Sequence, residues 1–407
     1  MKMTRVALAV SATIFATSAL ATNGTNMTGV GAQYSAMGGT GVAAYYGAEN
    51  VVVNPGMIGK STGTEFSFGG TLFKPEVAND GSNPAGGKTT STADTFVIPS
   101  VSLSSRINDT LTFGIGMYGT SGMGVDYNKA TSPAQAGLFE AQSNLQIMRF
   151  VPTLAFNKEN FGIGFSPIIQ YGSLDINYNG TNLGAGNTGK GAASDLGMGF
   201  SIGGYFDINK DLTLAASYTS AIDMKYDGQL STASTPFVNV GALTKAFSDD
   251  LEQPAEIKVG VAYTVGNIML TADAKQIKWG EAKGYKDFNW EDQNVFALGA
   301  KYKGDKYWVG VGYNKADNPI KAMNAMAPNG AAINLFNNLF FPATTEQHFS
   351  LGGGYNITKD VSIDVAAVFS PEEKTTVTGP GPLPNTLADN TSTHSQAAYT
   401  VSVRYNF

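Results

Sequence analysis

Few side chains in this sequence are suited to covalent chemistry. The only histidines are His348 and His394, and cysteine is absent. His348 and Ser350 share a strand face, but side chains at this spacing rarely form the nucleophile and base of a hydrolase. The run 184–190 matches a phosphate-binding loop by count, yet Gly191 follows where Ser or Thr is required. We therefore predict no catalytic residue, no cofactor and no metal site.

Binding of apolar molecules is better supported, because apolar residues gather in segments that otherwise read as loops. In the segment 319–344, Ile333, Phe336 and Phe340 fall on one helical face. Such a surface is a liability unless it binds something, and methionines adapt to varied shapes. We expect these loops to capture cargo; packing of the loops on one another is the alternative. The predicted capture residues are Met123, Leu138, Phe139, Phe237, Leu243, Phe247, Met323, Met326, Leu335, Phe336 and Phe340.

A cargo molecule with a carboxylate would also need a cation inside the protein, since an unpaired buried charge is costly. Basic residues lie on the polar faces of the alternating segments described next. The candidates are Arg149, Lys258, Lys275 and Arg404. Acidic residues nearby offer each of them a structural partner instead, since most charges within a membrane protein are paired. These acids are Glu256, Asp273 and Asp364.

Alternation of apolar and polar residues is the main structural signal in the chain. It is clearest from Ala397 to the terminal Phe407, and its period of two is typical of β-strands. Only 14% of residues are charged, against about 25% in an ordinary soluble domain. After residue 21, no run approaches the roughly 18 apolar residues of a spanning helix. The composition, with 43% hydrophobic residues and net charge −6, also argues against a disordered chain and a nucleic-acid binder.

Short polar turns alternate with long loops between these segments. Turns at 209–211 and 304–306 contrast with loops at 228–252, 319–344 and 373–393. Outer-membrane barrels have this arrangement, whereas a soluble two-sheet protein would carry more charge on its outward faces. We predict an all-β transmembrane antiparallel barrel of about 14 strands. Aromatic residues near strand ends are expected to form interfacial girdles: Tyr205, Tyr218, Trp279, Trp290, Tyr313 and Tyr405.

The N-terminal region divides into two parts. Residues 1–21 have the basic start, apolar centre and small-residue cleavage site of a secretory signal peptide; a buried N-terminal helix is the alternative. Residues 22–62 do not alternate and are glycine-rich and nearly uncharged. Such a segment ahead of a wide barrel is suited to fold into the lumen as a plug, whereas an extended periplasmic tail would be more polar. The expected units are therefore a signal peptide (1–21), a plug or hatch (22–62) and a barrel (63–407).

Several motifs in the plug point to a known family. They are Gly29-Val30-Gly31, the run 36–43, and Ala48-Glu49-Asn50 leading to Asn54-Pro55-Gly56; similar runs follow at 98–99, 106–109 and 317–320. With these motifs the whole mature chain resembles the FadL/TodX family of outer-membrane transporters for long-chain fatty acids and other hydrophobic compounds. The family has Asn-Pro-Ala where this chain has Asn54, Pro55 and Gly56, so the packing of this triplet is expected to differ.

The resemblance implies a hatch that moves and a gap in the barrel wall near the third strand, through which cargo leaves sideways. The sequence supports weak pairing there, because proline cannot donate to a strand ladder and glycines permit a kink. The residues concerned are Pro99, Gly114, Gly116 and Gly119. Barrel curvature alone is the alternative explanation.

We predict a passive outer-membrane transporter of a Gram-negative bacterium, without enzymatic activity, that takes up long-chain fatty acids or similar hydrophobic molecules. Alkanes and aromatic hydrocarbons are equally compatible cargoes. A general diffusion porin is the alternative, although the plug and apolar loops fit it poorly. A barrel lipase or esterase would depend on His348. We expect a monomer surrounded by outer-membrane lipids, with no nucleic-acid partner.

Overall fold

The computed structural model describes residues 22–81, 88–128, 140–381 and 386–407. The predicted signal peptide (1–21) lies outside these residues, as do two predicted capture residues, Leu138 and Phe139. No helix within the described part of the chain has both the length and the apolar character that a membrane span requires.

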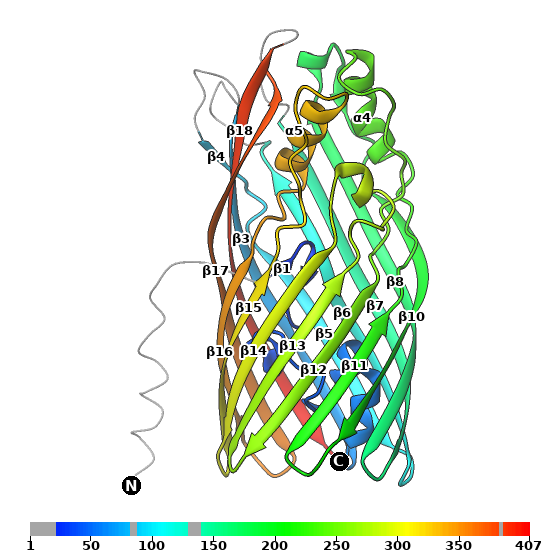
Figure 1. Cartoon of the computed structure of the whole chain (residues 1–407), viewed down its shortest axis with the longest axis vertical. Coiled ribbons are helices and arrows are strands. Elements are labelled where there is room, and N and C mark those ends of the chain that lie inside the picture. The colour runs from blue at the N-terminus through cyan, green and yellow to red at the C-terminus, as the bar shows by residue number, and fades with distance from the viewer. Residues whose placement is uncertain (1–21, 82–87, 129–139, 382–385) are drawn as a thin grey trace.

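Fourteen long strands of the described chain form a closed antiparallel barrel (Figure 1). Each strand pairs with the next. Residues Thr391 to Asn406 of β18 pair with β3, so the first and last strands close the sheet. The prediction of about 14 strands is confirmed. Their bounds are β3 (Thr64–Asp80), β5 (Phe96–Arg106), β6 (Leu111–Asp126), β7 (Gln142–Lys158), β8 (Phe161–Asn179), β10 (Ala193–Asp207), β11 (Leu212–Thr219), β12 (Glu256–Val265), β13 (Ile268–Ile277), β14 (Gln293–Lys303), β15 (Tyr307–Ala316), β16 (Gln347–Asn356), β17 (Val361–Pro380) and β18 (Leu387–Asn406).

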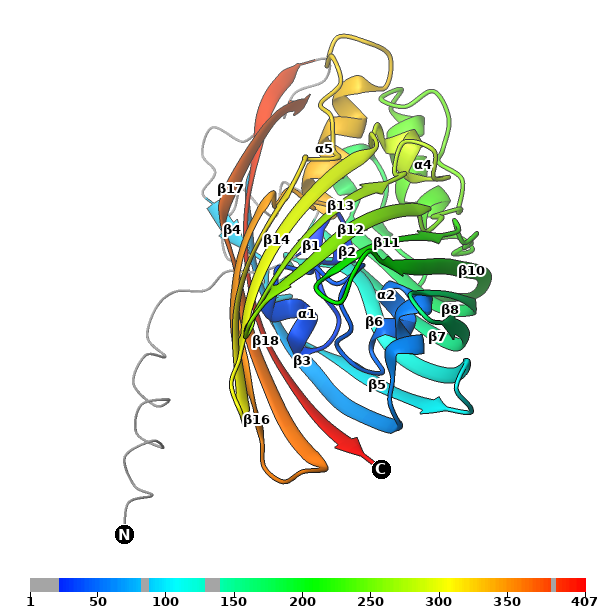
Figure 2. The same cartoon turned by 60° about the horizontal axis from the view of Figure 1, so that its bottom comes forward.

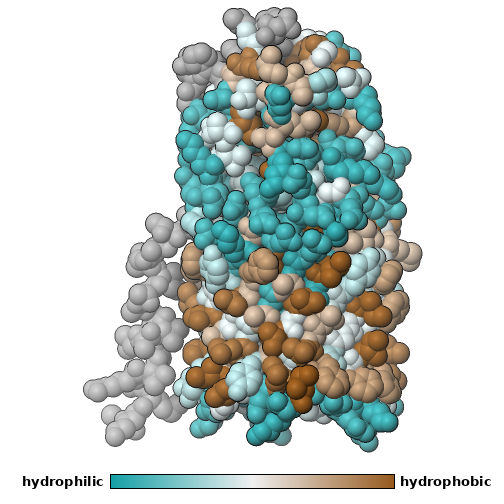
Figure 3. All heavy atoms as spheres, in the orientation of Figure 1, coloured by the Kyte–Doolittle hydropathy of each residue, from teal (hydrophilic) through white to brown (hydrophobic). Residues whose placement is uncertain are grey.

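The outward faces of the strands form an apolar belt. In β8, exposed Phe161, Ile163 and Phe165 alternate with buried Gly162 and Gly164. Figure 3 shows this belt as a brown band in the lower part of the molecule, below a hydrophilic zone. A strand needs only about 9–11 residues to cross the hydrocarbon. The 20-residue strands β17 and β18 therefore continue well beyond the belt.

The two ends of the barrel differ in their connections. One end has short turns and the C-terminus, and the other has the long loops (Figure 1). The predicted loop at 373–393 is wrong for residues 373–380 and 387–393, because β17 and β18 stay paired as far as Pro380 and Leu387, past a register shift after Ser370. Residues 382–385 of that prediction lie outside the described residues. The β-branched residues at 375–378 favour an extended strand over a loop.

Residues 22–62 lie inside the barrel, and we call this segment the plug (Figure 2). Most of its side chains are buried. Gly38 adopts φ +70°, and a Cβ there would lie 2.8 Å from the backbone nitrogen of Tyr313 in β15. Close packing against the wall therefore requires glycine at this point. The plug contains β1 (Thr22–Asn23), β2 (Asn26–Met27), α1 (Ala32–Ala36), α2 (Asn50–Val53) and η1 (Pro55–Lys60).

The long loops fold over the other end of the lumen, and we call this region the cap. The helical face predicted from Ile333, Phe336 and Phe340 belongs to α5 (Gly330–Phe340), and all three side chains are buried. The remaining short elements beyond the belt are β4 (Lys88–Thr90), η2 (Thr181–Leu183), β9 (Asn187–Thr188), α4 (Leu230–Asn239) and η3 (Tyr285–Phe288).

Candidate transport route

Most of the predicted capture residues meet in one apolar cluster within the cap. The ring of Phe336 lies 5.2 Å from that of Phe247 and 4.9 Å from that of Phe340, measured between centroids. Met326 stays apart, with 81% of its surface exposed. In this conformation the cluster closes the top of the lumen. Its predicted members are Met123, Phe237, Leu243, Phe247, Met323, Leu335, Phe336 and Phe340.

Three aromatic residues expected in the membrane girdles point inward instead. Trp279 and Trp290 are buried in the cap, where their indole nitrogens donate to Gln293 and Asn337. Tyr205 is also buried, with the Lys60 ammonium 4.5 Å from its ring centroid. The girdle prediction is wrong for these three residues, because a position near a strand end does not by itself decide which face an aromatic ring occupies.

An opening interrupts the wall between β5 and β6. Their pairing ends at Ser100 and Tyr118, and β6 shifts register between Gly119 and Ser121. A cavity of about 430 Å³, which we call the side cavity, lies at this point. Its lining includes both inward-facing and outward-facing residues of β7, so it reaches both faces of the wall. These residues are Leu145 and Ile147, which face inward, and Asn144 and Gln146, which face outward.

The four residues predicted for the lateral opening occupy two different places. Pro99 and Gly119 line the side cavity. Gly114 and Gly116 lie lower in β6, where it is fully paired with β5. A Cβ at Gly114 would lie 2.7 Å from Val51 of the plug. Absence of a side chain at Gly114 therefore makes room for the plug, which is a different role from the predicted one.

The start of the plug covers the inner side of this opening. Gly122 of β6 donates its N–H to the carbonyl of Thr25 at 3.0 Å. The hydroxyls of Thr25 and Ser121 lie 2.8 Å apart, and Asn26 pairs with Ser121. Met27 lines the side cavity as well. A few hydrogen bonds thus hold residues 22–27 across the route between the lumen and the opening.

A charged cavity of about 70 Å³ lies in the lumen behind Met27, which lines both cavities. Its wall carries three cations and two carboxylates, which leaves one positive charge in excess. The predicted carboxylate partners among these residues are Arg149, Lys258 and Lys275; the two acids are Glu256 and Asp273.

The acids of the charged cavity already have partners. Glu256 receives the Lys258 ammonium at 3.1 Å, and Asp273 accepts the N–H groups of Gly41 and Val42 in the plug. Among the described residues, neither Lys275 nor Arg149 forms an ion pair, but Arg149 donates to the side-chain oxygen of Gln170 at 2.9 Å. Lys275 is consequently the cation of the charged cavity most available to a visiting anion.

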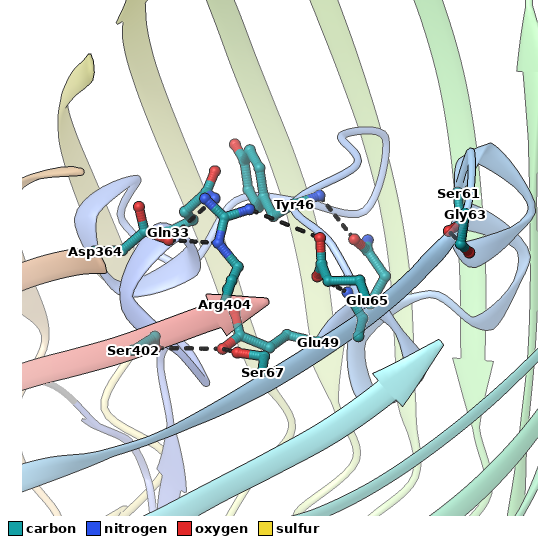
Figure 4. A network of polar contacts seen from close by, with 12 residues as sticks. Gln33, Tyr46, Glu49, Ser61, Gly63, Glu65, Ser67, Asp364, Ser402 and Arg404 are labelled. Atoms are coloured by element: carbon teal, nitrogen blue, oxygen red, sulfur yellow. Dashed lines mark hydrogen bonds and ion pairs between the residues drawn. The ribbon is translucent and has the colours of Figure 1, made fainter. Parts of the chain in front are cut away.

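The fourth predicted partner, Arg404, lies elsewhere and is paired with two carboxylates of the barrel wall. Its guanidinium donates to Asp364 at 2.6 Å and lies 3.9 Å from Glu65 (Figure 4). Glu65 accepts the N–H of Ala48, and Glu49 accepts the hydroxyl of Ser67 at 3.0 Å. We call Glu49, Glu65, Asp364 and Arg404 the plug network.

The plug network is expected to make stability depend on pH. Burial raises the pKa of Glu49 in the plug to about 7, while Arg404 and Ser67 act in the opposite direction. A carboxyl whose pKa is raised on folding stabilises the protein fully below its unfolded pKa, and this contribution is lost as pH rises through the folded value. As pH rises from about 5 to about 8, we expect the thermal midpoint of unfolding to decrease, and to decrease less in Glu49→Gln than in the native protein. Circular dichroism in detergent micelles measures the thermal midpoint. Identical pH profiles for the native protein and Glu49→Gln would contradict the role of Glu49 in this pH dependence.

The triplet Asn54-Pro55-Gly56 ties the plug to itself and to β10. The Asn54 side chain donates to the carbonyls of Val42 and Gly204 and accepts the N–H of Gly56. A Cβ at Gly56 would lie 2.7 Å from the carbonyl oxygen of Gly203. Close contact with β10 therefore explains why the third position here is glycine.

The hydrolase alternative finds no support in the geometry. His348 contacts Asn314 through Nδ1 at 3.2 Å. The Ser350 hydroxyl donates to the carbonyl of Ala36 and accepts the N–H of Gly38, so it serves plug packing. Within the described residues, no group of three or more acidic, histidine or cysteine side chains is arranged to hold a metal ion.

A closed barrel with a lumenal plug, an apolar cap and an opening in its wall defines an outer-membrane transport protein. The chain belongs to the outer membrane protein transport protein family (OMPP1/FadL/TodX), whose model matches residues 8–407. This family consists of transport proteins. It confirms the predicted family, the outer-membrane location and the absence of enzymatic activity.

Individual relatives are distant in sequence but similar throughout. A long-chain fatty acid transport protein of Escherichia coli O6:H1 is 23% identical over 429 residues, which cover 91% of this chain and 92% of that protein. The crystal structure of a Pseudomonas aeruginosa FadL homologue has a TM-score of 0.71 at 16% identity, covering 94% of this chain and 100% of that one. The P. putida toluene transporter TodX has a TM-score of 0.68 at 18% identity, covering 93% and 99%. These structures show a shared fold.

Proposed function

We propose that this protein carries long-chain fatty acids, or hydrophobic molecules of similar shape, passively across the outer membrane. The apolar cluster within the cap captures the cargo, and the side cavity releases it. The side cavity is the main observation that supports this proposal, because inward-facing and outward-facing residues of the same strand line it. A hydrophobic molecule released there avoids the aqueous periplasm.

The side cavity is positioned for release at the border of the apolar belt. Met117 and Phe150, exposed beside it, belong to the apolar surface, whereas Asn144 and Gln146 above them are polar. Cargo leaving between these residues would enter the membrane near its headgroup region. This location suits a molecule with one polar end and an apolar body.

We propose that residues 22–62 act as the hatch and that residues 63–407 form the barrel. The hydrogen bonds of Thr25 to Ser121 and Gly122 must break for cargo to pass from the lumen into the side cavity. The plug network holds the rest of the plug in place meanwhile. We also propose that the protein functions as a monomer surrounded by outer-membrane lipids. Closure of the barrel through β3 and β18 supports this, since no second chain is needed to complete the wall.

The charged cavity is proposed to receive the carboxylate of a fatty acid, with Lys275 as its main partner. A hydrogen bond to a charged group contributes about 1.5–3 kcal/mol, or roughly 10–100-fold in affinity. Lys275→Met is therefore expected to reduce uptake of hexadecanoate at low concentration by about tenfold. Uptake of hexadecane, which has the same chain length and no charge, should stay within about twofold. Radiolabelled uptake into cells that lack other transporters of the family measures both.

A matched control separates this effect from general damage. Lys359 is 90% exposed in a turn, so Lys359→Met should leave both uptake rates unchanged. An equal loss of both cargoes in Lys275→Met would indicate a damaged route. Unchanged hexadecanoate uptake would remove Lys275 from the proposed site.

Uncharged hydrocarbons are a second candidate cargo. Among the described residues that line the side cavity, none is Asp, Glu, Lys or Arg. Preference for hexadecane over hexadecanoate in the native protein would favour this class. A general diffusion porin fits less well because the plug occupies the lumen; a large steady conductance in planar bilayers would support it.

A further inference from the structure

A third cavity, at the short-turn end of the barrel, has features of an anion-binding site. It has a volume of about 270 Å³ and lies between the plug and the turns after β14 and β16. Gly304 and Asn356 form its rim at these turns, and Tyr45 and Tyr46 of the plug form its inner wall. We call it the turn-end cavity. It lies apart from the side cavity and the charged cavity, and shares no lining residue with either.

Lys301 of β14 is the central cation of this cavity. Its ammonium lies 5.1 Å from the ring centroid of Tyr46 and 4.8 Å from that of Trp308. It also donates a hydrogen bond to the side-chain oxygen of Gln33. None of the ion pairs among the described residues involves Lys301, so two aromatic faces and one amide stabilise its charge.

Among the described residues, the charged side chains that line the turn-end cavity are all basic. Lys303, on the same strand, and Arg404, on β18, line it together with Lys301. Arg404 is already paired with Asp364 and Glu65, which do not line the cavity. Lys301 and Lys303 therefore remain as cations without a lining carboxylate to balance them.

We propose that the turn-end cavity binds a small carboxylate that carries an aromatic or short apolar group. The carboxylate would pair with Lys301, which lacks an acidic partner within the described chain. The cavity is larger than one oxyanion requires, and the rings of Tyr45, Tyr307 and Trp308 line the remaining space. Such a ligand would reach the cavity from the periplasmic side and contact the plug. This site goes beyond the proposed transport function, since cargo on the lateral route does not pass through it.

Fluorine NMR of purified protein in non-ionic detergent provides the test. Titration with 4-fluorobenzoate is expected to give a saturable change in the fluorine signal, whereas uncharged 4-fluorobenzamide gives none. Lys301→Met should raise the dissociation constant for 4-fluorobenzoate by at least about tenfold. Lys275→Met, which removes a lumen cation of the charged cavity, should leave it unchanged. This comparison separates the turn-end cavity from the proposed transport site.

A folding test and a second variant complete the experiment. The heat-dependent shift of a folded barrel in gel electrophoresis shows whether Lys301→Met has folded. If Lys301→Met has not folded, Lys303→Gln, which changes an exposed residue, should still weaken binding of 4-fluorobenzoate. Binding that is equally strong for the amide, or unaltered by both lysine variants, would overturn the proposal. Inorganic phosphate that competes as well as benzoate would overturn the assignment of an apolar group.

Discussion

Oxidation of a cysteine pair introduced by Ile98→Cys and Gly119→Cys is expected to reduce cargo uptake by about tenfold or more, and reduction to restore it. The two positions lie next to each other where β5 and β6 stop pairing, and both line the side cavity. A Cβ at Gly119 would lie 3.7 Å from the Cβ of Ile98, close to the mean of about 3.8 Å in disulfides. The native chain has no cysteine that could compete for either partner.

The geometry also explains why both substitutions are needed. A side chain at Gly119 alone would meet the Cγ2 methyl of Ile98 at 2.4 Å, and Ile98→Cys removes that methyl. The reduced double variant and each single variant serve as controls for uptake. Alkylation of free thiols before and after oxidation reports how much of the bridge has formed. Normal uptake by fully oxidised protein would show that cargo does not pass between β5 and β6.

Arg404→Met is expected to lower the free energy of unfolding by about 3 kcal/mol. The change leaves the carboxylates of Asp364 and Glu65 buried without their cation, with side chains only 1% and 9% exposed. Removal of one partner from a buried ion pair is costly because the other charge loses its compensation. Urea unfolding in detergent micelles, followed by intrinsic fluorescence, measures the difference.

Two comparisons test the origin of this loss. Removal of an exposed cation, as in Lys359→Met, should change stability by less than about 0.5 kcal/mol. The loss in Arg404→Met should become smaller at acidic pH, because protonated carboxylic acids no longer need a cation. Adding Asp364→Asn to Arg404→Met should recover part of the lost stability. A loss that is independent of pH and unaffected by Asp364→Asn would assign Arg404 a packing role instead.

The barrel could be predicted from the sequence because its signal is local. Each strand of the belt repeats apolar and polar residues with a period of two, so one short segment such as 397–407 already shows which face meets lipid. The region 373–393 resembles a loop in its sequence because strands above the belt have no apolar face to mark them. There, threonines extend β17 and β18, which are joined by backbone pairing and by side-chain hydrogen bonds such as that between Thr376 and Thr391.

The site was only partly predictable, since much of it depends on contacts between distant segments. Pro99 and Gly119 stand out locally because each disturbs a strand ladder, and both line the opening. For Arg404, by contrast, the sequence leaves two roles open, a partner for a cargo carboxylate or a structural pair with an acid such as Asp364. The structure shows the structural pair, with Asp364 and Glu65. These acids come from other strands, and periodicity does not reveal which lumen charges pair.

The plug network also has a consequence for assembly. Ser67 on the first strand of the barrel and Ser402 on the last both donate to the same oxygen of Glu49, and Ser402 lies 353 residues after Glu49 in the chain. Contacts at such separation form late, because the intervening chain must be ordered first. A growing or half-inserted chain lacks one side of this anchor. This anchor of the plug is therefore complete only when the two ends of the sheet have met, which couples the final position of the plug to closure of the barrel.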